Sequence, residues 1–248
     1  MMRLGSKVAL ITGASSGIGK ATAIELAKEG ARVALAARGP ELLHEVQMEI
    51  QKIGSEAIVY PMNVSNKDDW AGFVSKVIEN WQKIDILINN AGIMPLSFIR
   101  NLRIDEWEEM IDVNLKGVLF GTAAVLPYMR SQGYGHIVNI SSTAGRWLFD
   151  GGAVYCATKF AVNAFSEGFR QEITSTENIR MTLIEPGITA TNLSNTIKDP
   201  DIKASSGNNT PIAPLQPSDI AAAVVYALTQ PPHVNVNEIL VMPTQQKI

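Results

Sequence analysis

The stretch KVALITGASSGIGKATAIELAKEG, residues 7–30, holds an apolar run, a glycine-rich loop and an amphipathic segment in direct succession. The apolar run has the composition of a buried strand, and residues 19–30 have the pattern of a helix that ends at a glycine. Between them, Gly13, Gly17 and Gly19 let the backbone turn sharply, and the helix start offers free N–H groups to an anion. A strand, loop and helix in this order predict a dinucleotide-binding unit.

The same alternation of apolar runs and helical segments continues along the chain. Most runs are continuously apolar, which is typical of strands covered on both faces of a parallel sheet. Alternating strands and helices favour right-handed crossovers and a doubly wound sheet. We therefore expect one α/β domain over residues 1–248, a Rossmann fold whose parallel sheet has about seven strands, with helices on both faces. The strands are expected at 7–13, 31–38, 56–64, 84–92, 135–142, 179–187 and 237–243, and the first helices at 19–30, 40–54 and 66–84.

Residues 189–219 interrupt this pattern. The segment is polar and rich in Asn, Ser, Thr and Pro. A long segment without a strand or helix pattern in a compact domain is often a lid or binding loop, so we expect a substrate-loop insertion here.

Composition excludes several kinds of site and partner. The net charge of −3 gives no basic field for nucleic acid. The single cysteine, Cys156, excludes an internal disulfide and a cysteine-based zinc site, and the three histidines form no metal-binding pattern. The first apolar run is too short to span a membrane and lacks a signal-peptide cleavage pattern. These features predict a cytoplasmic protein with a small-molecule substrate, no metal, no nucleic acid and no membrane partner.

The end of the second strand bears on the choice of nicotinamide cofactor. NAD-selecting folds carry an acidic residue there, but this chain has Ala37 followed by Arg38. A guanidinium is suited to bind a 2′-phosphate, so the position favours NADP(H) over NAD(H), although a solvated arginine in a turn would look the same.

Tyr155 and Lys159 lie four residues apart in the stretch AVYCATKFAV, residues 153–162, and so share one face of a predicted helix. A lysine beside a tyrosine hydroxyl stabilises the phenolate, and we expect it to lower the pKa of Tyr155 towards neutrality. Such a tyrosine can exchange a proton at physiological pH. Two further residues support a catalytic role for this pair. Ser142 lies at the carboxyl end of a predicted strand, where ligands bind in α/β sheets. Asn114 lies among apolar neighbours inside a predicted helix, where asparagine is unfavourable unless it has a specific role.

Taken together, these motifs resemble the short-chain dehydrogenase/reductase family over nearly the whole chain. The ordered matches are the glycine loop 12–19, NNAG at 89–92, Asn114, Ser142, Tyr155, Lys159 and Pro186-Gly187. The tail HVNVNEILVMPTQQ, residues 233–246, also resembles an NADP-dependent branch that includes clavulanic acid dehydrogenase and the NADP-dependent serine and 3-hydroxy acid dehydrogenases.

The resemblance implies reversible hydride transfer between NADP(H) and a carbonyl or secondary alcohol. It implies Tyr155 as the acid/base, Lys159 as the residue that lowers its pKa and holds the nicotinamide ribose, Ser142 as the group that polarises the carbonyl, and Asn114 as the holder of a relay water. At position 63 the family usually has Asp, and here Asn63 keeps an acceptor oxygen for the adenine but loses the charge. The cofactor residues so implied are Gly13, Ser15, Ser16, Gly17, Ile18, Gly19, Arg38, Asn63, Val64, Asn90, Ala91, Gly92, Tyr155, Lys159, Pro186, Gly187, Ile188 and Thr191, the last two through the Ile188 backbone and the Thr191 hydroxyl at the carboxamide.

The substrate is less well defined by sequence. The stretch 145–155 is large and mostly apolar, which favours ketones or aldehydes of moderate size. Arg146 would favour a hydroxy acid if it bound a carboxylate, and it reads equally well as a surface charge. The candidate substrate residues are Ser142, Thr143, Arg146, Trp147 and Phe149.

Two other functions stay open at this point. An NADP-binding regulator or redox sensor would use the fold without turnover, but it would not need the full Ser-Tyr-Lys set. A nucleotide-sugar isomerase or epimerase would need a fuller substrate domain than the residues after 190 supply. The apolar helical segments 107–129 and 153–173 predict a homo-oligomer, a dimer or a tetramer as in the family.

Overall fold

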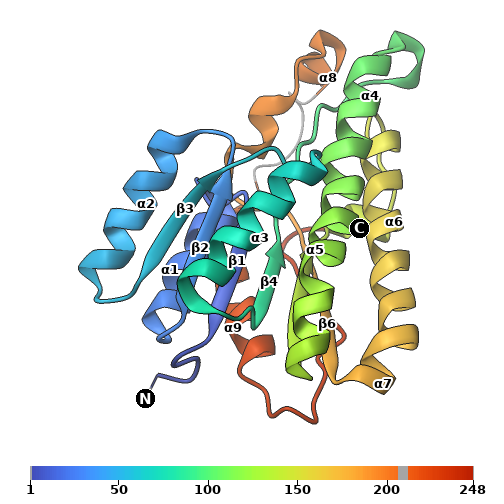
Figure 1. Cartoon of the computed structure of the whole chain (residues 1–248). Coiled ribbons are helices and arrows are strands. Elements are labelled where there is room, and N and C mark those ends of the chain that lie inside the picture. The colour runs from blue at the N-terminus through green and yellow to red at the C-terminus, as the bar shows by residue number, and fades with distance from the viewer. Residues whose placement is uncertain (1, 206–211, 248) are drawn as a thin grey trace.

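The computed structural model describes residues 2–205 and 212–247, and within them the strands form one parallel sheet. The strand order is β3-β2-β1-β4-β5-β6-β7, so the chain winds outward in both directions from β1 and β4 (Figure 1). This confirms the predicted doubly wound sheet. The strands are β1 (Val8–Thr12), β2 (Arg32–Ala37), β3 (Ala57–Pro61), β4 (Ile86–Asn89), β5 (Gly135–Ile140), β6 (Ile179–Pro186) and β7 (Glu238–Val241).

Helices cover both faces of the sheet. Successive residues of each strand point to opposite faces, so each strand contributes side chains to two cores. In β1, Ala9 and Ile11 belong to the core beneath α1, α2 and α9, whereas Val8 and Leu10 belong to the core beneath α3, α5 and α6. Both faces are therefore buried, which explains the continuously apolar runs. The helices are α1 (Gly17–Lys28), α2 (Pro40–Lys52), α3 (Lys67–Trp81), α4 (Ile104–Met110), α5 (Gly117–Gln132), α6 (Ala153–Phe169), α7 (Ser175–Glu177), α8 (Pro200–Ser205) and α9 (Pro217–Leu228).

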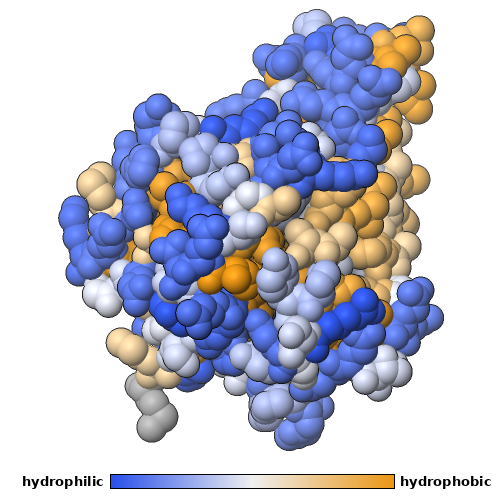
Figure 2. Space-filling view, in the orientation of Figure 1, coloured by the Kyte–Doolittle hydropathy of each residue, from blue (hydrophilic) through white to orange (hydrophobic). Residues whose placement is uncertain are grey.

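A π-helical turn, Ile111–Lys116, joins α4 to α5 and makes one long helical segment, Ile104–Gln132. By length and composition alone this segment is apolar enough to cross a membrane, a test that core helices of soluble proteins also pass. Here it packs against α6 through α4 and against β4 and β5 through α5. Figure 2 shows apolar surface on the side of the molecule formed by α5 and α6. Tyr128 of α5 and Phe160 of α6 are 37% and 42% exposed.

The segment 189–219 is more structured than we expected. It contains a 3₁₀ turn, Asn192–Thr196, and the short helix α8, which projects at the top of Figure 1. A single bridge pairs Thr189 with Leu215, and the last three residues of the expected insertion already belong to α9. Residues 206–211 of that insertion lie outside the described residues.

Candidate active site

A cleft of about 1250 Å³ lies at the carboxyl ends of the strands, where the loops after β1, β2, β3, β4, β5 and β6 meet. Among the described residues that line it, none is an aspartate or glutamate, whereas Arg38, Lys159 and Lys247 are basic. A wall with this charge favours an anionic ligand such as a nucleotide.

The glycine loop forms one end of this cleft and requires its glycines. Gly13 and Gly17 have φ of +63° and +54°, in the left-handed region that side chains disfavour. A Cβ atom on Gly19 would lie 2.2 Å from the Gly13 carbonyl oxygen, so the helix start could not approach the loop. The Asn90 side chain braces this loop by donating to the Thr12 carbonyl oxygen at 2.9 Å and to the Gly13 carbonyl oxygen at 3.2 Å.

The start of α1 fits a phosphate. Ser16 caps the helix with extended backbone but makes no side-chain cap hydrogen bond, and no acidic residue lies in the first turn. The first-turn N–H groups and the helix dipole therefore offer a binding site for an anion.

Nearly all of the residues implied by the resemblance as cofactor contacts line the cleft. Gly19 is the exception, because it is buried between the loop and α1. The cleft is lined by Gly13, Ser15, Ser16, Gly17, Ile18, Arg38, Asn63, Val64, Asn90, Ala91, Gly92, Tyr155, Lys159, Pro186, Gly187, Ile188 and Thr191.

Three of these residues already use the groups that we expected to contact a cofactor. The Asn63 Oδ1 accepts from the backbone N–H of Ser65 at 3.1 Å and from its hydroxyl at 2.9 Å, a local turn that competes with an adenine contact. The Ile188 N–H donates to Gln246 Oε1 at 2.8 Å. The Thr191 hydroxyl oxygen accepts from Leu193 N–H at 3.4 Å.

Tyr155 and Lys159 lie side by side on α6 and are both buried, with 5% and 6% of their surface exposed. The Lys159 Nζ lies 5.8 Å from the Tyr155 ring centroid and donates to the Ile140 carbonyl oxygen at 3.0 Å. Burial lowers the pKa of Lys159 to about 8. Burial also raises the pKa of Tyr155 to about 12, although its hydrogen bond with Ser142 opposes this rise. This direction is opposite to the expectation that Lys159 lowers the pKa of Tyr155 towards neutrality, because loss of hydration around the buried ring dominates.

Ser142 follows β5 and faces the tyrosine. It caps a 3₁₀ turn, Thr143–Gly145, and its Oγ accepts from the Ala144 N–H at 3.1 Å. The hydroxyl is thus fixed by the local backbone while it contacts the hydroxyl of Tyr155.

Asn114 lies in the π-helical turn, behind the cleft wall. Its Oδ1 accepts from the Ile93 N–H at 2.9 Å, and its Nδ2 donates to the Ile93 carbonyl oxygen at 2.9 Å and to Thr158 Oγ1 at 3.2 Å. A Cβ atom built on Gly92 would lie 3.4 Å from this Oδ1 and 3.9 Å from the Lys159 Nζ. The Asn114 side chain therefore links the loop after β4 to α6 at a point close to Lys159.

The other end of the cleft is mostly apolar. Thr143, Trp147 and Phe149 line it as expected. The two segments expected to form the substrate pocket also line it, through Leu148 in 145–155 and through Leu193, Ser194, Thr196 and Ile212 in 189–219. The sequence did not point to the C-terminal residues Gln246 and Lys247, and only the position directly after NNAG pointed to Ile93, Met94 and Leu96.

Arg146 corrects one expectation. It is not among the residues that line the cleft, and its Nε donates to both carboxylate oxygens of Glu185 at 2.8 Å. Its Nη2 donates to Glu185 at 2.6 Å and also pairs with Glu238. The guanidinium is therefore committed to two carboxylates of the protein and does not reach a substrate carboxylate.

Comparison with known proteins agrees with this geometry. Residues 7–201 match the family model described as short chain dehydrogenase. The chain is 43% identical over 250 residues to an oxidoreductase of Staphylococcus saprophyticus, with all of both chains covered.

Solved structures add cofactor-bound relatives. The closed form of serine dehydrogenase complexed with NADP⁺ is 36% identical, with a TM-score of 0.88 over 97% of this chain and 96% of that one. An alcohol dehydrogenase from the archaeon Thermococcus sibiricus, complexed with 5-hydroxy-NADP, is 32% identical, with a TM-score of 0.86 over 98% of both chains. With its parallel sheet, glycine loop and family match, the chain belongs to the short-chain dehydrogenase family of oxidoreductases.

Proposed function

We propose that this chain is an NADP(H)-dependent oxidoreductase that interconverts a carbonyl and a secondary alcohol. The observation that carries the proposal is the buried group of Tyr155, its hydrogen-bond partner Ser142 and the adjacent Lys159, at the edge of a cleft whose described lining has no carboxylate. Family membership and the NADP-bound relatives support the same reaction class.

In this proposal each side chain has a distinct task. The nicotinamide, when bound, supplies or accepts the hydride. Tyr155 gives its phenolic proton to the forming alkoxide, and a pKa raised by burial keeps that proton in place at neutral pH until it is needed. Ser142 donates to the carbonyl oxygen and orients it, while Lys159 holds the ribose and stabilises the phenolate. Asn114 holds the water through which Lys159 recovers the proton.

Arg38 is the basis for choosing NADP(H). Its side chain lies at the end of β2, is 74% exposed and approaches Glu109 only to 3.9 Å, so the guanidinium is available to a 2′-phosphate. No carboxylate among the described lining residues opposes this phosphate. The cofactor contacts at Ser15, Ser16 and the first turn of α1 belong to the same proposal.

For the substrate, the proposal is a neutral ketone or aldehyde with an apolar substituent. Met94, Trp147 and Phe149 are among the apolar side chains of the cleft, and Arg146 is held by Glu185 and Glu238. Arg146 is therefore not available to bind the carboxylate of a 3-hydroxy acid at this end of the cleft. A cytoplasmic location and a homo-oligomeric state stay predictions.

The test is a cofactor and substrate panel. Oxidation of NADPH is followed with neutral ketones, aldehydes and 3-oxo acids, and NADH is run in parallel. We expect turnover with NADPH, much less with NADH, and the best rates with neutral ketones or aldehydes. Tight NADPH binding without turnover across the panel would favour the regulator or redox-sensor alternative.

A further inference from the structure

The loop that carries Ser142 is tied to helix α6 at both of its ends. At the first end, the Ser141 hydroxyl donates to Asn163 Oδ1 at 2.6 Å. At the second end, the Gly145 carbonyl oxygen accepts from Asn163 Nδ2 at 3.1 Å. One amide side chain therefore bridges the loop on either side of the serine.

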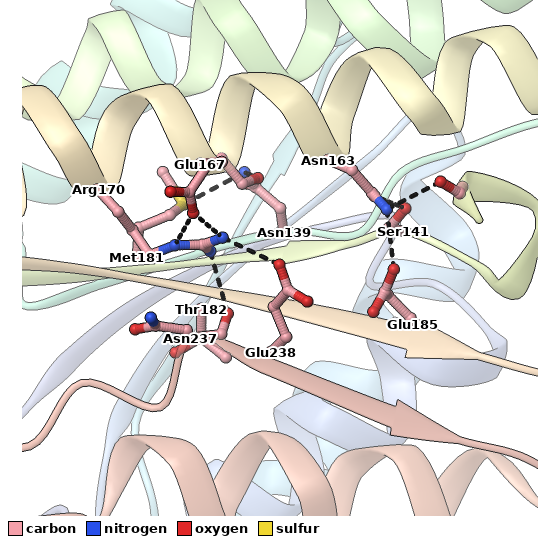
Figure 3. Close-up of polar contacts among 12 residues, drawn as sticks. Asn139, Ser141, Asn163, Glu167, Arg170, Met181, Thr182, Glu185, Asn237 and Glu238 are labelled. Carbon is pink, nitrogen blue, oxygen red and sulfur yellow. Dashed lines mark hydrogen bonds and ion pairs between the residues drawn. The ribbon is translucent and has the colours of Figure 1, made fainter.

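Asn163 is held in one orientation by these contacts. Its Nδ2 also donates to Glu185 Oε1 at 2.8 Å, so the oxygen and the nitrogen of the amide each have a fixed partner, as Figure 3 shows. Rotating the amide by half a turn would set its oxygen against the Gly145 carbonyl oxygen and the Glu185 carboxylate, neither of which can donate a hydrogen bond.

The carboxylate that orients Asn163 is itself firmly held. Glu185 on β6 has no exposed surface, and its charge is balanced by the double contact from Arg146. Arg146 directly follows the 3₁₀ turn that Ser142 caps, so the same ion pair also anchors the far end of the loop. A buried carboxylate with a bidentate arginine gives a rigid support, because removing Arg146 would leave the Glu185 charge buried without a counter-charge.

Asn163 shares a helix face with the reacting groups. Tyr155, Lys159 and Asn163 are spaced by four residues along α6, so they follow one another along one side of the helix. The first two reach the cleft, and the third reaches the serine loop.

We propose that Asn163, oriented by Glu185, is a positioning residue that sets the Ser142 hydroxyl against Tyr155 and Lys159. This inference rests on the proposed oxidoreductase function and assigns no contact with substrate or cofactor to Asn163. It explains why a polar amide and a fully buried carboxylate occupy the interior between α6 and β6.

The position of Ser142 also affects how the reaction rate depends on pH. The hydrogen bond from Ser142 lowers the pKa of Tyr155 against the opposing effect of burial. The other titratable groups around this hydroxyl are Lys159 and Cys156, which the change at Asn163 leaves in place. A loosened Ser142 loop therefore raises the pKa of Tyr155, whereas a partly unfolded enzyme only loses rate equally at every pH.

The experiment compares Asn163→Ala with Glu167→Gln, a control on the same helix that removes the ion pair between the exposed Glu167 and the buried Arg170. For Asn163→Ala we expect kcat to fall about 10- to 100-fold with the KM for NADPH unchanged, because a small misplacement of a reacting group has a cost of this size. We also expect the high-pH limb of the kcat profile to move to higher pH. The control should match the wild type in both. Unchanged kcat, or a reduced kcat with an unmoved pH profile, would overturn the proposal.

Ser141→Ala serves as a second variant that removes only one hydroxyl, in case Asn163→Ala folds poorly. It should show the same direction of pH shift with a smaller loss of kcat, and wild-type behaviour would again overturn the proposal. A wild-type enzyme without turnover would instead contradict the proposed function. In that case the absorbance change of tyrosine ionisation at alkaline pH, taken as the difference between each protein and its Tyr155→Phe variant, still tests the inference, which requires a higher pKa of Tyr155 in Ser141→Ala than in the wild type.

Discussion

Lys159 keeps its amino group inside the protein, where it donates to the carbonyl oxygen of Ile140. Burial lowers the pKa of this amino group from 10.5 to about 8. The unfolded chain therefore binds the proton more tightly than the folded chain. The charged lysine destabilises the fold below pH 8, and this effect fades as pH rises from 8 towards 10.5.

Lys159→Met should accordingly raise the free energy of unfolding at neutral pH by up to about 3 kcal/mol, because a buried charge is replaced by an apolar chain of similar length. The gain should shrink as pH approaches about 10. Denaturant unfolding of the cofactor-free protein at both pH values measures it. A gain of the same size at both would show that packing, and not the charge, is responsible.

Arg38 is the residue on which the cofactor preference depends. Arg38→Ala should weaken NADPH binding by about 10- to 100-fold, the size of one lost charge-assisted hydrogen bond, and leave NADH binding nearly unchanged. Titration of the two reduced cofactors measures both effects. Equal weakening for NADPH and NADH would contradict a contact with the 2′-phosphate.

At the scale of elements, the 3₁₀ turn and α8 are held onto the loop after β4 by a buried carboxylate. Asp199 accepts from the Ser97 hydroxyl at 2.5 Å and from Asn101 Nδ2 at 2.8 Å, and it caps α8 through the Asp201 N–H. These hydrogen bonds lower the pKa of Asp199 to about 2. The attachment is therefore present above the ordinary aspartate pKa and is lost only as pH falls towards 2, so it is constant over the neutral range.

Asp199→Ala should free the segment 192–205 from the loop 97–101. We expect faster amide hydrogen exchange in that segment and a higher KM for the carbonyl substrate, because Leu193, Ser194 and Thr196 line the cleft. Hydrogen exchange read by mass spectrometry, together with steady-state kinetics, measures the two effects. Lys203→Ala is the matched control on α8, because Lys203 is exposed on the same helix.

At the scale of the whole molecule, the apolar surface on α5 and α6 predicts self-association. Phe160→Glu places a charge in the middle of α6, on its exposed side. We expect this variant to sediment as a smaller species than the wild type, with the same circular dichroism. A monomeric wild type would show that this surface does not bind a second copy.

The sheet and the grouping of Tyr155 with Lys159 were predictable because both depend on local pattern. Strands covered on both faces read as continuous apolar runs, and Tyr155 and Lys159 share a face through helical spacing alone. The role first considered for Arg146 was wrong for a physical reason. Its partners Glu185 and Glu238 come from β6 and β7, and only the folded sheet brings these strands to the serine loop.

Two other features also required the three-dimensional structure. The pKa of Tyr155 depends on how completely the ring is buried, which spacing does not reveal. Gln246 reaches the turn after β6 only because β7 pairs with β6 and returns the C-terminus to the cleft. The sequence pattern therefore does not predict which distant residues come into contact or how deeply a side chain is buried.

We propose Tyr155 as the proton donor of an NADPH-dependent carbonyl reductase. The direct measurement is the kcat of wild type and Tyr155→Phe with the best carbonyl substrate, alongside the dissociation constant of NADPH for each. We predict a loss of kcat of at least about 100-fold, the usual contribution of a general acid, with NADPH affinity within about twofold. A Tyr155→Phe variant that keeps most of its turnover would show that Tyr155 is not the proton donor.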